Sequence, residues 1–219
     1  MLSPEEHAEF LLATETVRQA ALRHLEAMRS VPHVIYFIAS LQRGVDSVAQ
    51  TVAAGGPQFA CKAGCSHCCN VRVEALEPEV FQIARALKKL PAETLGEITR
   101  RLQQHVAMVS GMPLAQQQSP CPFLENHLCT IYSVRPAVCR KAHSFEVAKC
   151  EEAGAEIPQS LALLLKAEAL MQGTAAAYRE VNLAASGHEL GQAVLLALAD
   201  AGTESRWALG EPIFDVDAC

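Results

Sequence analysis

Hydrophobic residues recur at intervals of three and four along much of the chain, which is the spacing of one helix face. The clearest example is the segment 33–53, whose hydrophobic face comprises Ile35, Ile38, Leu41, Val45 and Val48. Alanine and leucine are abundant and aromatic residues make up only 5% of the chain, which favours helix packing over a sheet sandwich. The pattern therefore predicts an all-α protein.

Residues that favour helix ends mark the boundaries of the expected helices. Ser3 can cap a helix that has Pro4 in its first turn and Glu6 as its third residue, and this helix is expected to run to about Arg29. Gly55-Gly56-Pro57 is expected to end the second helix. Further helices are expected at 79–90, 91–110, from near 133–136, at 157–183 and at 188–201, with a loop at 111–120 and little strand character beyond 71–73.

These elements divide the 219 residues into three regions that are expected to form one compact domain. They are an N-terminal helical region at 1–56, a loop-rich cysteine core at 57–152, and a C-terminal helical hairpin with a tail at 153–219. Half of the residues are hydrophobic, so the chain can bury a sizeable core without covalent staples. The hairpin is expected to pack on the cysteine core; a sharper interpretation gives it a surface for a protein partner.

Charge and the amino-terminal residues narrow the class of protein. The net charge of −6 argues against general nucleic-acid binding, which depends on clustered Lys and Arg. The first ten residues lack the pattern of a signal peptide, and the longest apolar stretch, 34–41, is too short to span a bilayer. We therefore expect a cytoplasmic protein with no membrane and no nucleic-acid partner, in a compartment that keeps thiols reduced.

Cysteine is the residue type that points to chemistry. The chain has nine cysteines, of which eight lie between residues 61 and 150. Disulfides are disfavoured by the missing export signal and by the odd count, and unlinked core cysteines would be scattered rather than grouped. Closely held thiolates repel one another unless a cation lies among them, so the grouping predicts a metal site.

The first cysteine group is compact. Its members are Cys61, Cys65, Cys68 and Cys69. If the segment is helical, their offsets of 4, 7 and 8 residues place the four side chains within about 100° of one helix face. Gly64 interrupts the segment, so a turn followed by a helix is an equal alternative.

The second group has wider spacings, so its ligands are expected to come from loops and helix ends. Its members are Cys121, Cys129, Cys139 and Cys150. Pro136 is expected in the first turn of a helix that holds Cys139, where the positive helix end lowers thiol pKa values. Arg135 and Arg140 would bind a cluster or an anionic substrate, or pair with carboxylates such as Glu125.

The order of these motifs resembles a known family. The chain reads C-x3-C-x2-C-C, then C-P-F-L, then C-x-I-Y-x-x-R-P-x-x-C-R, and this resembles the bacterial YkgJ-type cysteine-cluster family of zinc- or iron-chelating domains over about residues 58–150. The resemblance implies that the eight cysteines hold a metal. The family is also similar to the cysteine-cluster region of flagellin lysine N-methylases, which implies an iron–sulfur protein acting on a protein or peptide as an alternative.

The thiol pattern leaves the metal open between an iron–sulfur cluster and zinc. Zinc takes four ligands in a tetrahedron, and the adjacent pair Cys68-Cys69 is awkward for one such ion. A [4Fe–4S] cluster takes four dispersed thiolates, so iron–sulfur is favoured over zinc. Eight thiols can form two four-thiolate sites, one cluster with one zinc, or one cluster with spare thiols.

Neighbouring residues are expected to support the site rather than to bind the metal. His67 and His143 could each replace a cysteine, but with enough thiolates present both are expected to be polar neighbours. Phe123 and Tyr132 are expected to be core aromatic residues that shield the site, and Cys219 is expected to be free.

The predicted function is metal binding with a structural or metal-handling role. A redox or metal sensor is a third hypothesis beside the enzyme, and whether the chain is an enzyme stays open. The pattern C-x3-C-x2-C also occurs in radical S-adenosylmethionine enzymes, but Cys69 follows directly and no strand–helix alternation of a barrel surrounds it. No glycine-rich phosphate loop or dinucleotide fingerprint is present in the sequence.

Overall fold

The computed structural model describes residues 2–28, 30–113, 117, 119–152 and 154–214. The α-helices are α1 (Pro4–Ala27), α2 (Val31–Gly55), α3 (Glu77–Leu87), α4 (Ala92–Val109), α5 (Ala137–Lys141), α6 (Val147–Glu151), α7 (Leu161–Glu180), α8 (Leu190–Ala199) and α9 (Thr203–Ala208). Within the described residues, the 3₁₀ helices are η1 (His67–Asn70) and η3 (Tyr132–Val134). In the same residues, short antiparallel pairs join β1 (Glu74–Ala75) to β4 (His188–Glu189) and β2 (Leu124–Glu125) to β3 (Leu128–Cys129). The predicted all-α class is confirmed.

The first two helices begin where the sequence signals place them. The Ser3 hydroxyl accepts a hydrogen bond from the amide of Glu6 at 3.1 Å, and the Glu6 carboxylate accepts one from the amide of Ser3 at 2.7 Å. This reciprocal pair is the predicted capping box. Helix α2 is longer than the expected 33–53, because Pro32 fits its first turn and the helix continues to Gly55.

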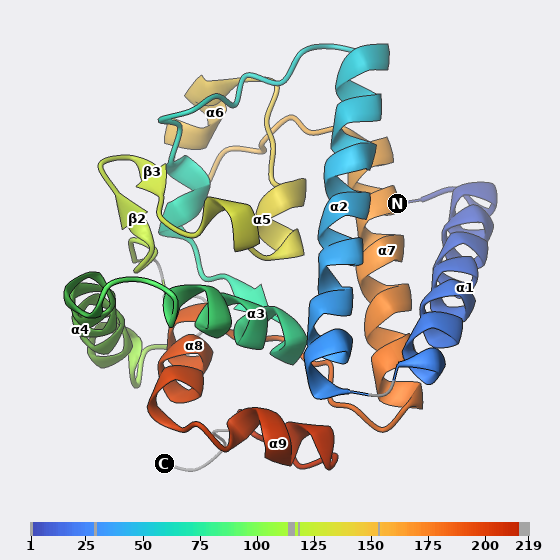
Figure 1. Ribbon diagram of the computed structural model, residues 1–219. Helices are drawn as coiled ribbons and strands as arrows, with labels where there is room; N and C mark the ends of the chain where they lie inside the picture. The colour runs from blue at the N-terminus through green and yellow to red at the C-terminus, as the bar shows by residue number, and fades with distance from the viewer. Residues whose placement is uncertain (1, 29, 114–116, 118, 153, 215–219) are drawn as a thin grey trace.

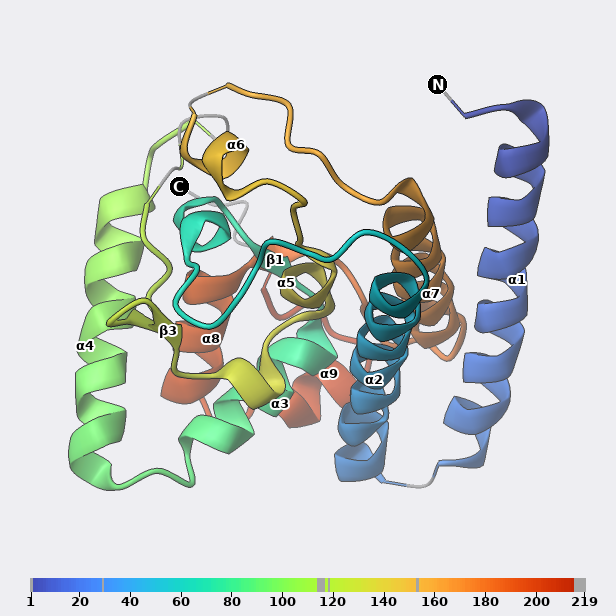
Figure 2. The same ribbon diagram turned by 90° about the horizontal axis from the view of Figure 1, so that it is seen from above.

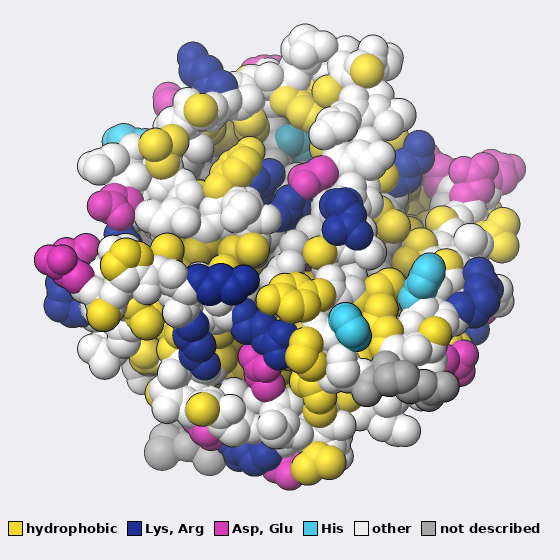
Figure 3. Space-filling model, viewed as in Figure 1, with side chains coloured by type: hydrophobic (Ala, Val, Ile, Leu, Met, Phe, Trp, Pro, Cys, Tyr) yellow, Lys and Arg dark blue, Asp and Glu magenta, His cyan; other side chains and the backbone are white. Residues whose placement is uncertain are grey.

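Helices α1, α2 and α7 form one side of the molecule, with α1 against α7 and α2 against α7 and α3 (Figures 1 and 2). The expected hydrophobic face of α2 points inward: Ile35, Ile38 and Val45 have no exposed surface. Figure 3 shows hydrophobic and histidine side chains exposed on the face where α1 and α2 lie. A groove of about 580 Å³ lies there, lined in part by His24, Met28, His33, Tyr36, Phe37 and Leu170.

The C-terminal helices are present, but the expected hairpin is wrong. Helix α7 packs against α1 and α2, whereas α8 packs against α3 and α4 on the other side of the molecule (Figure 1). The cause lies in the connection between them. The buried Glu77 carboxylate accepts a hydrogen bond from the amide of Ser186 at 2.7 Å and contacts Nε2 of His188 at 2.8 Å, which fixes this connection to α3.

The expected strand at 71–73 is displaced along the chain. The paired residues are Glu74 and Ala75, which lie opposite Glu189 and His188. The carbonyl of Val73 accepts a hydrogen bond from the amide of Leu190 at 2.9 Å, just outside the pair. The partner strand lies far away in the sequence, so local propensity does not place the pairing.

One buried hydrophobic cluster contains residues from all three regions of the sequence, including Ile38, Phe81 and Val194. The boundaries at 56 and 152 stay a prediction. No helix within the described part of the chain is both long enough and apolar enough to span a bilayer.

Candidate metal centre

The first cysteine group forms a turn followed by a short helix, which is the second of the two expected alternatives. Gly64 has a φ of +87°, a conformation that favours glycine. The amide of Cys65 donates to the carbonyl of Lys62 at 2.9 Å and so closes the turn. Helix η1 then carries Cys68 and Cys69, so the four thiols do not share one α-helical face.

The second cysteine group comes from one loop and three different elements. The amide of Cys121 donates to the carbonyl of Cys69 at 2.7 Å, which joins the two groups directly. Cys129 ends β3, and Cys139 lies in the predicted helix, α5, whose N-cap is Pro136. The expected lowering of the Cys139 pKa by the helix end is wrong, because burial raises this pKa. Cys150 lies in α6, which packs against η1. Figure 1 shows α5, α6 and the β2–β3 hairpin together on one side of the molecule, above α3.

A tight turn brings the β2–β3 hairpin to the first cysteine group. Asn126 and His127 both have positive φ, at 49° and 62°, which is the backbone of a two-residue hairpin turn. This geometry lets Nδ1 of His127 contact the hydroxyl of Ser66 at 3.1 Å. The His127 side chain therefore links the hairpin that holds Cys129 to the loop before η1.

Arg140 fixes the segment between Cys129 and Cys139. Its guanidinium donates to the carbonyls of Arg135 and Ser133 at 2.9 and 2.7 Å and to Asp46 of α2 at 2.5 Å. Arg135 also faces Asp46, at 3.8 Å. The carboxylate partner is therefore Asp46, whereas Glu125, the example considered from the sequence, pairs with Arg101 at 3.1 Å.

Glu79 is a supporting residue that no sequence motif predicts. Its side chain is buried in α3 and accepts hydrogen bonds from the amides of Ala137, at 2.7 Å, and Leu76, at 3.1 Å. Burial raises its pKa above the usual range for a carboxyl group. An acidic residue in a first helical turn is common on protein surfaces, so no local pattern marks Glu79 as the residue that anchors the N-terminus of α5.

Of the two aromatic residues that are expected in the core, one is buried and the other is exposed. Phe123 has no exposed surface, which confirms its prediction. The prediction for Tyr132 is wrong, because 64% of this residue is exposed. The guanidinium of Arg135 lies 3.6 Å from the centre of the Tyr132 ring, so this ring covers an arginine at the surface.

The two candidate histidines have other contacts. Nδ1 of His143 donates to the carbonyl of Lys141 at 2.8 Å, and Nε2 accepts from the amide of Ser160 at 2.7 Å. With both ring nitrogens engaged, His143 supports the loop after α5. Nε2 of His67 lies 3.5 Å from the carboxylate of Glu151, next to Cys150. The prediction for Cys219 lies outside the described residues.

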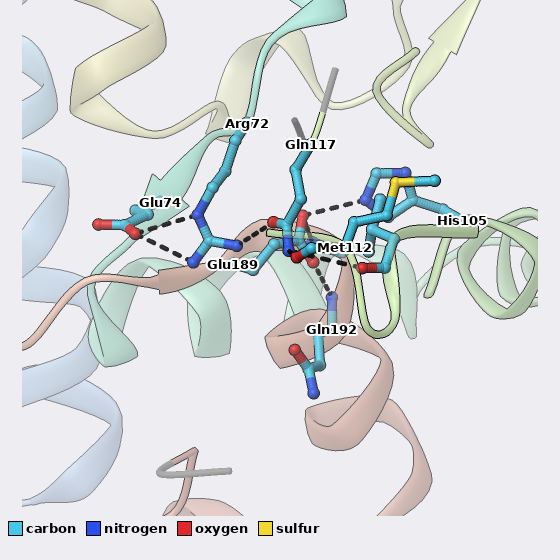
Figure 4. A network of polar contacts seen from close by, with 9 residues as sticks. Arg72, Glu74, His105, Met112, Gln117, Glu189 and Gln192 are labelled. Atoms are coloured by element: carbon cyan, nitrogen blue, oxygen red, sulfur yellow. Dashed lines mark hydrogen bonds and ion pairs between the residues drawn. The ribbon is translucent and has the colours of Figure 1, made fainter. Parts of the chain in front are cut away.

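Figure 4 shows a network of polar contacts among residues that include Arg72, His105 and Glu189. The buried side chains of His105 and Glu189 are 3.0 Å apart, and Glu189 also accepts hydrogen bonds from the amides of Gly191 and Gln192 at the start of α8. Arg72 contributes contacts to Glu74 and Gln117. A cavity of about 10 Å³ among these residues, which Cys121 also lines, has room for about one water molecule.

Neighbouring thiols strongly shift one another's pKa values. The hydrogen bond with Cys69 lowers the pKa of Cys68 to about 6, and the positive charges of His67 and Arg135 contribute. The same hydrogen bond raises the pKa of Cys69. Burial, together with the nearby charges of Cys129, Glu189 and Cys68, raises the pKa of Cys121 to about 11. An uncompensated set of thiolates is therefore unfavourable here.

This donor set fits zinc or iron in its chemistry. The eight cysteines from 61 to 150 carry free thiols, and thiolates are preferred ligands of zinc and iron–sulfur clusters. In the part of the chain that the structure describes, no three His, Cys, Asp or Glu side chains are arranged to hold an ion. The backbone brings the segments together, and a cation among the thiols would relieve their repulsion.

Comparison with known proteins gives one match. Residues 60–158 match the family model named CxxCxxCC, which is described as "Putative zinc- or iron-chelating domain". No curated protein and no solved structure matches the chain. The similarity to flagellin lysine N-methylases stays a prediction. All eight cysteines from 61 to 150 lie within the matched segment, so over somewhat less than half of its length the chain is similar to the CxxCxxCC family of zinc- or iron-chelating domains.

Proposed function

We propose that the chain holds an iron–sulfur cluster or zinc through its eight clustered cysteines, in a structural or metal-handling role. The proposed ligands are Cys61, Cys65, Cys68, Cys69, Cys121, Cys129, Cys139 and Cys150. The observation that carries this proposal is the direct hydrogen bond between the backbones of Cys69 and Cys121. It keeps two separated cysteine segments side by side.

The surroundings of the thiols support a structural role. Helices α5 and α6 have only five residues each, and β2 and β3 only two, so this region has little regular structure to stabilise it. A bound metal supplies thiolate–metal bonds that cross-link these segments. Glu79, Asp46 and Arg140 fix the backbone that presents Cys139, and so reduce the ordering that metal binding requires.

The number and softness of the ligands support iron–sulfur over zinc, with [4Fe–4S] as the expected cluster. Anaerobic purification followed by metal analysis and a visible absorption spectrum tests this. A brown protein with about four irons per cluster is the expected result. A colourless protein with stoichiometric zinc would exclude the cluster in the isolated protein, and a protein without bound metal would contradict the proposal as a whole.

A redox or metal sensor is the second candidate, because Cys61 and Cys68 are exposed. A sensing thiol needs access to oxidant or to exchanging metal, and exposure provides that access. Mild peroxide treatment with mass spectrometry tests this candidate. Oxidation of Cys61 or Cys68 that a thiol reductant reverses, together with metal release, supports it; irreversible oxidation throughout the chain contradicts it.

A further inference from the structure

We infer that the groove between α1 and α2 is a binding site for a small apolar molecule that carries a carboxylate, of the class of medium-chain fatty acids. The groove has a volume of about 580 Å³, which lies within the range of about 300–1,000 Å³ of small-molecule pockets. In the part of the chain that the structure describes, no cysteine lines this groove. The site is therefore separate from the proposed metal centre and does not depend on it.

Helix α7 forms the bottom of the groove. Helix α1 packs along α7 so closely that a Cβ at Gly173 would lie 2.6 Å from the carbonyl oxygen of Thr14. Helix α2 also packs against α7, and a Cβ at Gly44 would lie 3.3 Å from the side chain of Leu170. Figure 2 shows α1 and α2 on either side of α7. Side chains of α7, including Leu170 and Thr174, are therefore accessible between the two helices.

The walls of the groove are apolar. Val17 and Ala20 line the side formed by α1, and Phe37 and Leu41 line the side formed by α2. Among the described residues, no aspartate, glutamate, lysine or arginine lines the groove. An alkyl chain that lies against these walls is removed from water, which is the main source of affinity in such a pocket.

Thr174 places an unpaired hydroxyl at the bottom of this apolar groove. Its side chain lines the groove, and only 4% of the residue is exposed. Thr14, Thr51 and Thr99 in other helices each donate to the carbonyl one turn earlier, at 2.8–2.9 Å. Within the described residues, none of the side-chain hydrogen bonds of α7 includes the Thr174 hydroxyl. A ligand oxygen that accepts this O–H would satisfy a buried donor that the protein leaves unpaired.

Two histidines favour an acidic group on the ligand. His24 of α1 and His33 of α2 both line the groove, and both are exposed. The ring centre of His24 lies 5.8 Å from that of Phe37, and its ring nitrogens have no hydrogen-bond partner among the described residues. An imidazole N–H can donate to a carboxylate oxygen, and a protonated imidazole also attracts its charge. The groove therefore offers donors to a carboxylate in a chain whose net charge is −6.

The same features favour a small molecule over the helix of a partner. The apolar face of a helix would cover the groove but would leave the Thr174 hydroxyl without an acceptor. A carboxylate with an alkyl chain provides an acceptor for this hydroxyl and an apolar body for the walls.

Isothermal titration calorimetry with decanoate at neutral pH tests the site in the full chain. We expect one decanoate to bind per chain. Decyltrimethylammonium has the same alkyl chain with a cationic head group, and it should bind roughly tenfold more weakly because it accepts no hydrogen bond. Equal affinity for the two probes, or no binding of decanoate, would overturn the inference.

Two variants test the residues that carry the inference. Thr174→Val keeps the shape of the side chain and removes the hydroxyl, so it should weaken decanoate binding by about fivefold to tenfold without lowering the melting temperature of the free protein. Ala20→Phe fills the groove from α1 and should abolish binding. Ala8→Phe, the same change at an exposed position of α1 outside the groove, is the matched control and should bind decanoate like the wild type.

Wild-type affinity in either Thr174→Val or Ala20→Phe would overturn the inference. Size-exclusion chromatography tests whether a second copy of the chain occupies the groove instead. A wild-type dimer that Ala20→Phe converts to a monomer, with no change in Ala8→Phe, would overturn the small-molecule site.

Discussion

The amide of Cys121 donates a hydrogen bond to the carbonyl of Cys69 across 2.7 Å. The bond uses main-chain atoms, so it leaves both thiols available as ligands. It also sets the spacing between the first cysteine loop and the segment that enters the β2–β3 hairpin. The backbone therefore brings the two cysteine groups together. Metal binding then has to order mainly the cysteine side chains, because the chain segments are already side by side.

Removal of a proposed ligand should lower metal content and stability together. Cys65→Ser and Cys129→Ser each remove one proposed ligand, so we expect each variant to hold less metal than the wild type. A loss of about 2 kcal/mol in the free energy of unfolding lowers the melting temperature of a chain of this size by about 4–8 °C. Metal analysis and thermal unfolding measure both effects. Cys219→Ser, the same change outside the proposed set, is the control; full metal and an unchanged melting temperature in the ligand variants would show the assignment to be wrong.

The contacts of Arg140 predict that lysine cannot replace it. Lysine keeps a positive charge for Asp46 but cannot reach the carbonyls of Ser133 and Arg135 at the same time. We expect Arg140→Lys to reduce the free energy of unfolding by about 1–3 kcal/mol. Denaturant unfolding measures this loss. Arg206→Lys, at an exposed ion pair with Asp200, is the control and should change stability by less than about 1 kcal/mol.

The Glu189–His105 contact predicts a dependence of stability on pH. Burial by itself would raise the pKa of Glu189, but the hydrogen bonds from His105 and from the amides of Gln192 and Gly191 outweigh it and lower the pKa. A carboxyl group with a lowered folded-state pKa stabilises the protein above its unfolded pKa, near 4.5, and this contribution disappears as the pH falls through the folded value. Glu189→Gln should therefore cost about 1–3 kcal/mol at pH 7 and progressively less below pH 4.5.

Urea unfolding of the wild type and of Glu189→Gln between pH 3 and pH 7 measures this difference. Glu125→Gln, at an exposed ion pair, is the matched control and should show little dependence on pH. A difference between wild type and Glu189→Gln that stays constant over this range would contradict the assignment.

Two Gly→Ala substitutions should have opposite effects on stability. One glycine lies where α1 closely approaches α7, and the other lies in α4 beside open space. A Cβ at Gly173 would lie 2.6 Å from the carbonyl oxygen of Thr14 and 2.7 Å from Cβ of Val17, so Gly173→Ala should force α1 away and cost about 1–3 kcal/mol. Gly96 in α4 has open space, so Gly96→Ala should stabilise the protein by about 0.4–1 kcal/mol. Thermal unfolding measures both effects. Metal content should not change in either variant, because neither helix carries a cysteine.

Local sequence patterns predicted most of the secondary structure. Ser3 and Glu6 cap α1 as expected, and the period of hydrophobic residues gave the buried face of α2. Gly64 and Pro136 marked the turn and the helix start beside Cys65 and Cys139. Tyr132 was mistaken for a core residue, because a hydrophobic ring beside a motif looks the same in the sequence whether it packs inward or covers an arginine.

The sequence by itself determined that this protein is helical, that eight cysteines are grouped, and that zinc or iron is the class of ligand. These properties depend on residue type and on local spacing, which the chain carries directly. The tertiary structure decided that α7 and α8 separate, that Asp46 and Glu79 support the cysteine region, and that Cys69 lies against Cys121. These contacts join residues far apart in the chain, and their free energy depends on packing and burial, which local propensity does not encode.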